Sequence, residues 1–108
     1  MRWLLSILFF SAFAQDFRLE ASRHLELAIT WMSQYVPDGE APGNVELAQR
    51  GESEFMEVLR LEPNNKTALV SLASLNYLEA DGATDLDEKL RRFDNAESWC
   101  EKVLAVDP

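Results

Sequence analysis

The sequence has one cysteine, Cys100, and one histidine, His24, among its 108 residues. A single cysteine excludes an intramolecular disulfide, and the two side chains fall short of the four ligands of a structural zinc site. Basic residues are also scarce, with 10 Lys and Arg against 19 Asp and Glu, and the net charge of −9 argues against a basic nucleic-acid-binding face. The low content of glycine and proline, four of each, excludes collagen-like and low-complexity chains. The composition therefore indicates one small acidic domain.

The first fourteen residues, 1–14, have the features of a secretory signal peptide. Arg2 supplies a positive charge, and an apolar run follows that ends in Ala12-Phe13-Ala14, an A-x-A cleavage site. This run is shorter than the roughly 20 residues needed to span a bilayer. We therefore expect cleavage after Ala14, an extracytoplasmic location (secreted or periplasmic) and no membrane contact after cleavage. The alternatives are an uncleaved anchor and a buried N-terminal helix.

Beyond residue 14, apolar side chains recur at steps of three and four, which is the period of an α-helix. The loop Pro37–Gly43, Pro63 and Gly82 interrupt the pattern, and Thr84 is placed to cap the last segment. No segment alternates as a strand would. The sequence therefore predicts an all-α fold of antiparallel helix hairpins, with helices near residues 17–36, 45–61, 66–79 and 85–106.

Two segments, Phe55–Pro63 and Cys100–Pro108, align without gaps at an offset of 45 residues. Both contain Val-Leu, followed by an apolar residue, an acid and a proline at matching positions. A fixed period combined with helix hairpins is typical of helical solenoids.

On these residues the chain resembles the tetratricopeptide repeat (TPR) family, in which a hairpin of about 34 residues ends in an apolar–x–apolar–acid–Pro pattern. The junction Glu62-Pro63-Asn64-Asn65 fits the family pattern between one repeat and the next. The characteristic large and small positions of the two helices are also filled, by Leu69, Leu72 and Ala73 in the first helix, and by Gly51 with Phe55 and Ala96 with Cys100 in the second.

The resemblance implies a short TPR-like right-handed solenoid. Residues 15–63 would form a first, irregular hairpin, and residues 64–108 a second hairpin with an insertion near 81–93, expected as extra turns at the start of its second helix. An unrelated four-helix bundle is the competing fold.

The resemblance also implies a function, that of a protein–protein interaction module or scaffold with a groove for a peptide or partner helix. The family's groove positions are occupied here by small or apolar residues and one aromatic: Thr67, Val70, Ser71, Ser74, Tyr77 and Leu78. Some members clamp a terminal carboxylate with Lys and Asn where this chain has Val70 and Ser74. We therefore expect an apolar or mixed contact. The alternatives are a structural domain that self-associates through an uncapped helix face, and a non-catalytic auxiliary domain of an enzyme complex.

No nucleophile–base pair, ligand cluster or phosphate-binding loop is visible in the sequence, so we expect no enzyme activity, no cofactor and no metal site. The acids around Gly82 lack the spacing of a calcium-binding EF-hand loop. We expect His24 to be an exposed helix residue and Cys100 a buried thiol. Trp31 and Trp99 are expected to pack in the core or between helices, with a role in recognition as the alternative.

Overall fold

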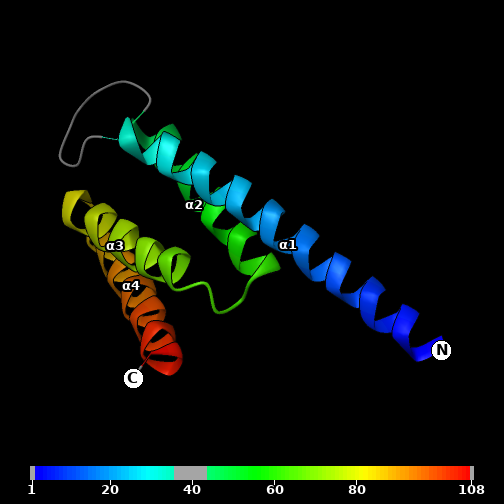
Figure 1. Cartoon of the computed structure of the whole chain (residues 1–108). Coiled ribbons are helices and arrows are strands. Elements are labelled where there is room, and N and C mark those ends of the chain that lie inside the picture. The colour runs from blue at the N-terminus through cyan, green and yellow to red at the C-terminus, as the bar shows by residue number, and fades with distance from the viewer. Residues whose placement is uncertain (1, 36–43, 108) are drawn as a thin grey trace.

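The structure, a computed structural model of the whole chain, describes residues 2–35 and 44–107, with side chains described for 17–35 and 45–107 (Figure 1). These residues form four α-helices: α1 (Arg2–Ser33), α2 (Asn44–Leu61), α3 (Lys66–Gly82) and α4 (Leu86–Val106). No strand occurs in either described range, so the predicted all-α fold is confirmed. The predicted loop Pro37–Gly43 lies outside the described residues.

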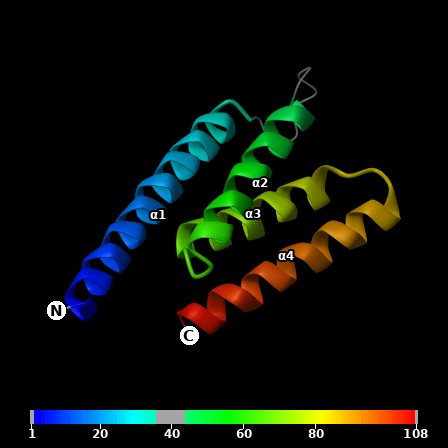
Figure 2. The same ribbon diagram turned by 90° about the vertical axis from the view of Figure 1, so that its right-hand side faces the viewer.

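The helices pack in adjacent pairs. α1 packs along α2 and α3 along α4, and a smaller contact between α2 and α3 joins the two pairs. Each pair is antiparallel (Figures 1 and 2). The first turns of α1 extend past the end of α2, which makes the molecule elongated, with extents of 63 × 30 × 19 Å (Figure 1).

The observed helix boundaries differ from the predicted ones at three places. α1 begins at Arg2 instead of residue 17, because its helical backbone continues through the apolar N-terminal run. α3 continues to Gly82 instead of ending at 79. Of the residues 81–93 expected as extra turns of the last helix, the first two therefore belong to α3, residues 83–85 form the connection, and the rest begin α4. The prediction that Thr84 caps α4 is wrong by one residue, since the Asp85 carboxylate accepts the hydrogen bond from the Glu88 backbone N–H at 3.1 Å.

Within the described ranges, none of the helices has the length and apolar character needed to cross a membrane.

The turn between α2 and α3 follows from its sequence. α2 ends at Leu61, because Glu62 precedes Pro63 and the residue before a proline disfavours helical backbone. Asn65 then caps α3, with its side-chain oxygen accepting a hydrogen bond from the Ala68 backbone N–H at 3.0 Å. The turn therefore brings α3 back against α2, which is the contact that joins the two pairs.

A buried hydrophobic cluster of the core lies where α1, α2 and α3 meet. Its buried members come from these three helices: Ala21, Ala28, Phe55, Val58, Ala68 and Leu72. The residues from α1 are small, which allows the backbones of α1 and α2 to approach closely. Trp99 of α4 is partly buried and packs against the same cluster, so the packing role predicted for this tryptophan is confirmed.

The close approach of α1 to α2 yields a prediction for Gly51. A Cβ atom at this buried position would lie 2.5 Å from the sulfur of Met32, whereas a Cβ at Gly82 would meet nothing within 4 Å. We expect Gly51→Ala to lower the free energy of unfolding by about 1 kcal/mol, because displacing Met32 outweighs the better helix propensity of alanine. Gly82→Ala is the matched control and should raise stability by about 0.5 kcal/mol. Urea denaturation followed by circular dichroism measures both, and equal effects would contradict the assigned close contact.

Candidate partner-binding groove

An apolar groove runs between α3 and α4, with a volume of about 920 Å³. We refer to it as the α3–α4 groove. From α3 it is lined by Val70, Ala73, Ser74, Tyr77 and Leu78, and from α4 by Phe93, Ala96, Glu97, Cys100, Val103 and Leu104. Glu97 is the one charged residue in this lining, so the surface is suited to an apolar partner.

Four of the six residues predicted from the sequence line this groove: Val70, Ser74, Tyr77 and Leu78. The other two, Thr67 and Ser71, also lie on α3 but are not part of the lining. The whole α4 side of the groove was missed by the sequence reasoning. The sequence does contain a signal for this side, because the apolar residues of α4 recur at helical spacing. That apolar face was interpreted as part of the protein interior instead of as a binding surface.

The aromatic rings at one part of the groove are held in place by each other. Tyr77 of α3 and Phe93 of α4 pack edge to face, with ring centroids 5.4 Å apart and planes at 70°. Tyr77 is nevertheless 59% exposed. Because the contact between the rings already restricts both side chains, they lose little conformational entropy when a partner binds to this apolar surface.

Cys100 is exposed, so the prediction of a buried thiol is wrong. The reason is visible at the residue 45 positions earlier, Phe55, which is 3% exposed because it lies in the core that includes α3. No described helix covers α4 in the same way. Val58 and its counterpart Val103 differ similarly, one fully buried and the other partly exposed. The apolar residues of α4 are therefore spaced like those of a buried helix, but the face that they form is exposed to solvent.

A polar network anchors the helices that form the groove. The Arg92 guanidinium of α4 donates hydrogen bonds to Asn76 of α3 at 3.1 Å and to Glu52 of α2 at 3.3 Å. Its Nε also donates to Glu88 at 3.1 Å. Asn76 is 1% exposed and donates to the Leu72 carbonyl at 2.8 Å, so both ends of its amide are satisfied. Three helices are thereby tied together at one point.

The charges in this network reinforce one another. Burial of the Arg92 guanidinium lowers its pKa, but the hydrogen bond to Glu88 and the charge of Glu52 outweigh this effect, and the net pKa is raised. Hydrogen bonds from Arg91 and Arg92 lower the pKa of Glu88. Arg92 and Glu88 therefore stabilise each other as charged groups.

Two further residues singled out in the sequence lie between α1 and α2. His24 is partly buried and pairs with Glu54, so the prediction of an exposed histidine is wrong. Trp31 is partly buried beneath the Arg50 guanidinium, which lies 4.8 Å from its ring centroid. In the portion of the chain with described side chains, no three His, Cys, Asp or Glu residues are placed to hold a metal ion.

The fold and the groove define the chain as an all-α protein of two antiparallel helix pairs with an open apolar surface between the last two helices. No protein-family model, curated protein or solved structure matches the chain. Any functional assignment therefore depends on the residues and geometry of the chain itself.

Proposed function

We propose that this protein is a TPR-like interaction module whose α3–α4 groove binds an amphipathic helix of a partner protein. The observation that carries the proposal is the 45-residue correspondence between α2 and α4. Phe55 and Val58 of α2 are buried in the core to which α3 contributes, whereas their counterparts Cys100 and Val103 lie in the open groove. A further helix packed on the second pair would bury this surface as α3 buries that of α2.

The groove also indicates the chemistry of that helix. The lining is apolar apart from Ser74 and Glu97, so the partner needs an apolar face with side chains at helical spacing. On α3, the residues in the core beside α2 are Ala68 and Leu72, one small and one large. A partner face that alternates small and large apolar side chains would fit by the same geometry.

We also propose that the chain is exported, which the apolar N-terminal run and the Ala12-Phe13-Ala14 motif support. N-terminal sequencing of the protein purified from its source tests this, with Gln15 expected as the first residue. Recovery of the chain from the cytoplasm with Met1 intact would contradict export.

A matched pair of substitutions on α4 tests the groove. Leu104 is 63% exposed and lines the groove, whereas Leu86 is 66% exposed and lies outside the lining. A photo-crosslinking amino acid at Ser74 identifies the bound segment, and the affinity of that purified segment is then measured by calorimetry. We expect Leu104→Gln to weaken binding at least about tenfold, because burying a leucine side chain contributes roughly 1.5–3 kcal/mol. Leu86→Gln should leave the affinity unchanged.

The unmodified thiol of Cys100 provides an independent readout, because a helix in the groove would shield it. Alkylation of Cys100 by iodoacetamide should slow when the crosslinked segment is added. An unchanged alkylation rate, or equal effects of the two leucine substitutions, would rule out this groove. If light scattering shows a dimer that Leu104→Gln dissociates, the occupant is a second copy of the chain, which is the self-association alternative.

A further inference from the structure

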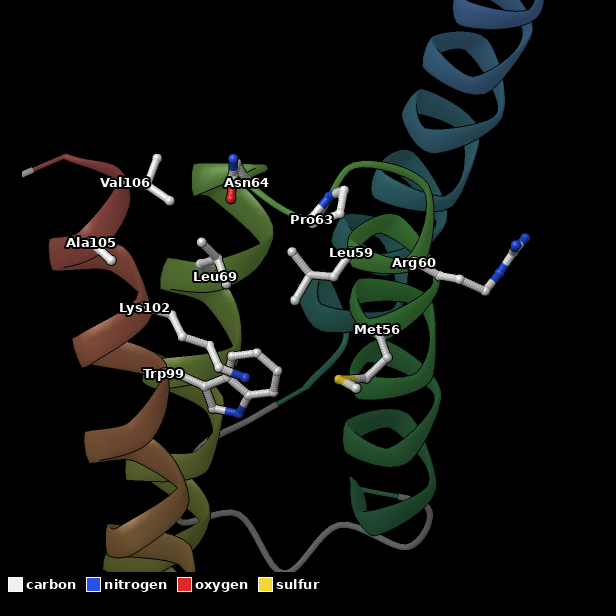
Figure 3. A pocket seen from close by; sticks show the side chains of 10 residues that line it. All are labelled: Met56, Leu59, Arg60, Pro63, Asn64, Leu69, Trp99, Lys102, Ala105 and Val106. Atoms are coloured by element: carbon white, nitrogen blue, oxygen red, sulfur yellow. The ribbon is translucent and has the colours of Figure 1, made fainter.

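A second hollow lies where the C-terminal ends of α2 and α4 meet the start of α3 (Figure 3). We refer to it as the Trp99 pocket. Its volume is about 720 Å³, within the range of small-molecule sites, and it shares no lining residue with the α3–α4 groove. The pocket is therefore a separate site from the groove proposed above for a partner helix.

The walls of the Trp99 pocket are apolar and face each other. Trp99 and Lys102 of α4 point toward Met56 and Leu59 of α2, and Leu69 of α3 lies between them (Figure 3). Trp99 and Leu59 are packed against the buried core, and Leu69 is 2% exposed, so these parts of the pocket are anchored. The pocket thus offers part of an aromatic ring and aliphatic side chains to an apolar ligand.

The charge of the pocket is opposite to that of the chain. The net charge of the protein is −9, yet the two charged residues that line this pocket, Arg60 and Lys102, are both cationic. Two smaller hollows on the surface of the described residues each have glutamate in their lining. A ligand carboxylate therefore meets no lining acid in the Trp99 pocket.

Lys102 is the cation available to such a ligand. The Arg60 guanidinium is paired with Glu57 and points away from the pocket (Figure 3). Lys66, nearby at the start of α3, is paired with Asp107. The Lys102 ammonium lies 4.2 Å from the centroid of the Trp99 ring and forms no ion pair with any carboxylate whose side chain the structure describes. A cation over an aromatic face keeps N–H groups free to donate to an anion.

We propose that the Trp99 pocket binds a small amphiphilic carboxylate, with its aliphatic chain between Trp99 and Met56 and its carboxylate on Lys102. The apolar walls supply most of the affinity, because burying apolar surface contributes more to binding than a largely exposed ion pair does. The ion pair with Lys102 selects for the negatively charged head group.

Trp99 is itself the reporter for the test. In the full chain with Trp3→Phe and Trp31→Phe, Trp99 is the remaining tryptophan, and its fluorescence is titrated with octanoate and, as the uncharged analogue, with octanol. We expect both to change the emission, with octanoate binding about two- to fivefold more tightly, the advantage that a largely exposed ion pair provides.

Lys102→Met and Lys89→Met form the matched pair of variants. Both residues lie on α4 and both changes remove one positive charge, but Lys89 does not line the pocket. Lys102→Met should reduce the affinity for octanoate to that for octanol, whereas Lys89→Met should leave it unchanged. Because methionine retains an aliphatic stem, binding of octanol should survive in both variants.

Three results would overturn the proposal: no change of Trp99 emission with octanoate, equal affinities of the unmodified pocket for octanoate and octanol, or equal losses in the two lysine variants. The comparison of octanoate with octanol uses no substitution at Lys102, so it tests the proposed carboxylate site even if the Lys102→Met variant does not fold.

Discussion

Replacing Leu72 by alanine is expected to lower the free energy of unfolding by about 2–5 kcal/mol, which is a large share of the roughly 5–15 kcal/mol of a typical domain. Leu72 is fully buried on α3 and belongs to the cluster that contains Phe55 and Val58 of α2. The substitution removes apolar contacts and leaves a cavity at the junction of the two helix pairs. Urea denaturation followed by circular dichroism measures the effect.

Leu86→Ala is the control for this prediction. Leu86 is 66% exposed at the start of α4, so the same chemical change removes little buried surface. We expect its effect to stay within about 0.5 kcal/mol, the usual range for surface substitutions. Comparable losses at the two leucines would show that the cluster around Leu72 does not join the helix pairs.

Replacing Arg92 by methionine is expected to cost about 2–4 kcal/mol. The side chain of Arg92 is 17% exposed and bonds to Glu52, Asn76 and Glu88, one on α2, one on α3 and one on its own helix. Its loss leaves the buried Asn76 oxygen without a donor, and an unsatisfied buried group costs more than the lost bond contributes. Chemical denaturation measures the loss, and alkylation of Cys100 reports whether the groove changes.

Two further variants separate this network from a general charge effect. Arg91→Met removes the same charge from the neighbouring position. There Arg91 pairs with Glu88 and with no other side chain that the structure describes, and its own side chain is 56% exposed, so about 0.5 kcal/mol is expected. Asn76→Leu combined with Arg92→Met removes both the donor and the orphaned acceptor. The double variant should therefore be more stable than the sum of the two single losses predicts. Strict additivity would contradict the coupling of these side chains.

The helices themselves could be predicted from local signals. The steps of three and four and the break at Pro63 identify α2 and the start of α3 closely. The errors fall where local signals compete. Thr84 and Asp85 are both good caps, and the choice between them depends on the backbone angles of the turn. The start of α1 was misplaced because an apolar leader and an apolar helix have the same composition.

The α3 side of the groove could be predicted from the register of the resemblance, as Val70 and Tyr77 show. The α4 side could not, because hydrophobic periodicity identifies an apolar face without showing what covers it. Cys100 illustrates this limit, since its register matches that of the buried Phe55 while its side chain is exposed.

The order of residues alone determines the class of fold, the helix period, the turn at Pro63 and the 45-residue correspondence, because each depends on neighbours a few positions apart or on direct alignment. The tertiary structure decides which apolar faces are covered, which cations are already paired and where distant helix ends form a pocket. These properties depend on contacts between α2, α3 and α4 that no local spacing records. Lys102 is the clearest case, since its availability follows only from the neighbours that folding assigns to it.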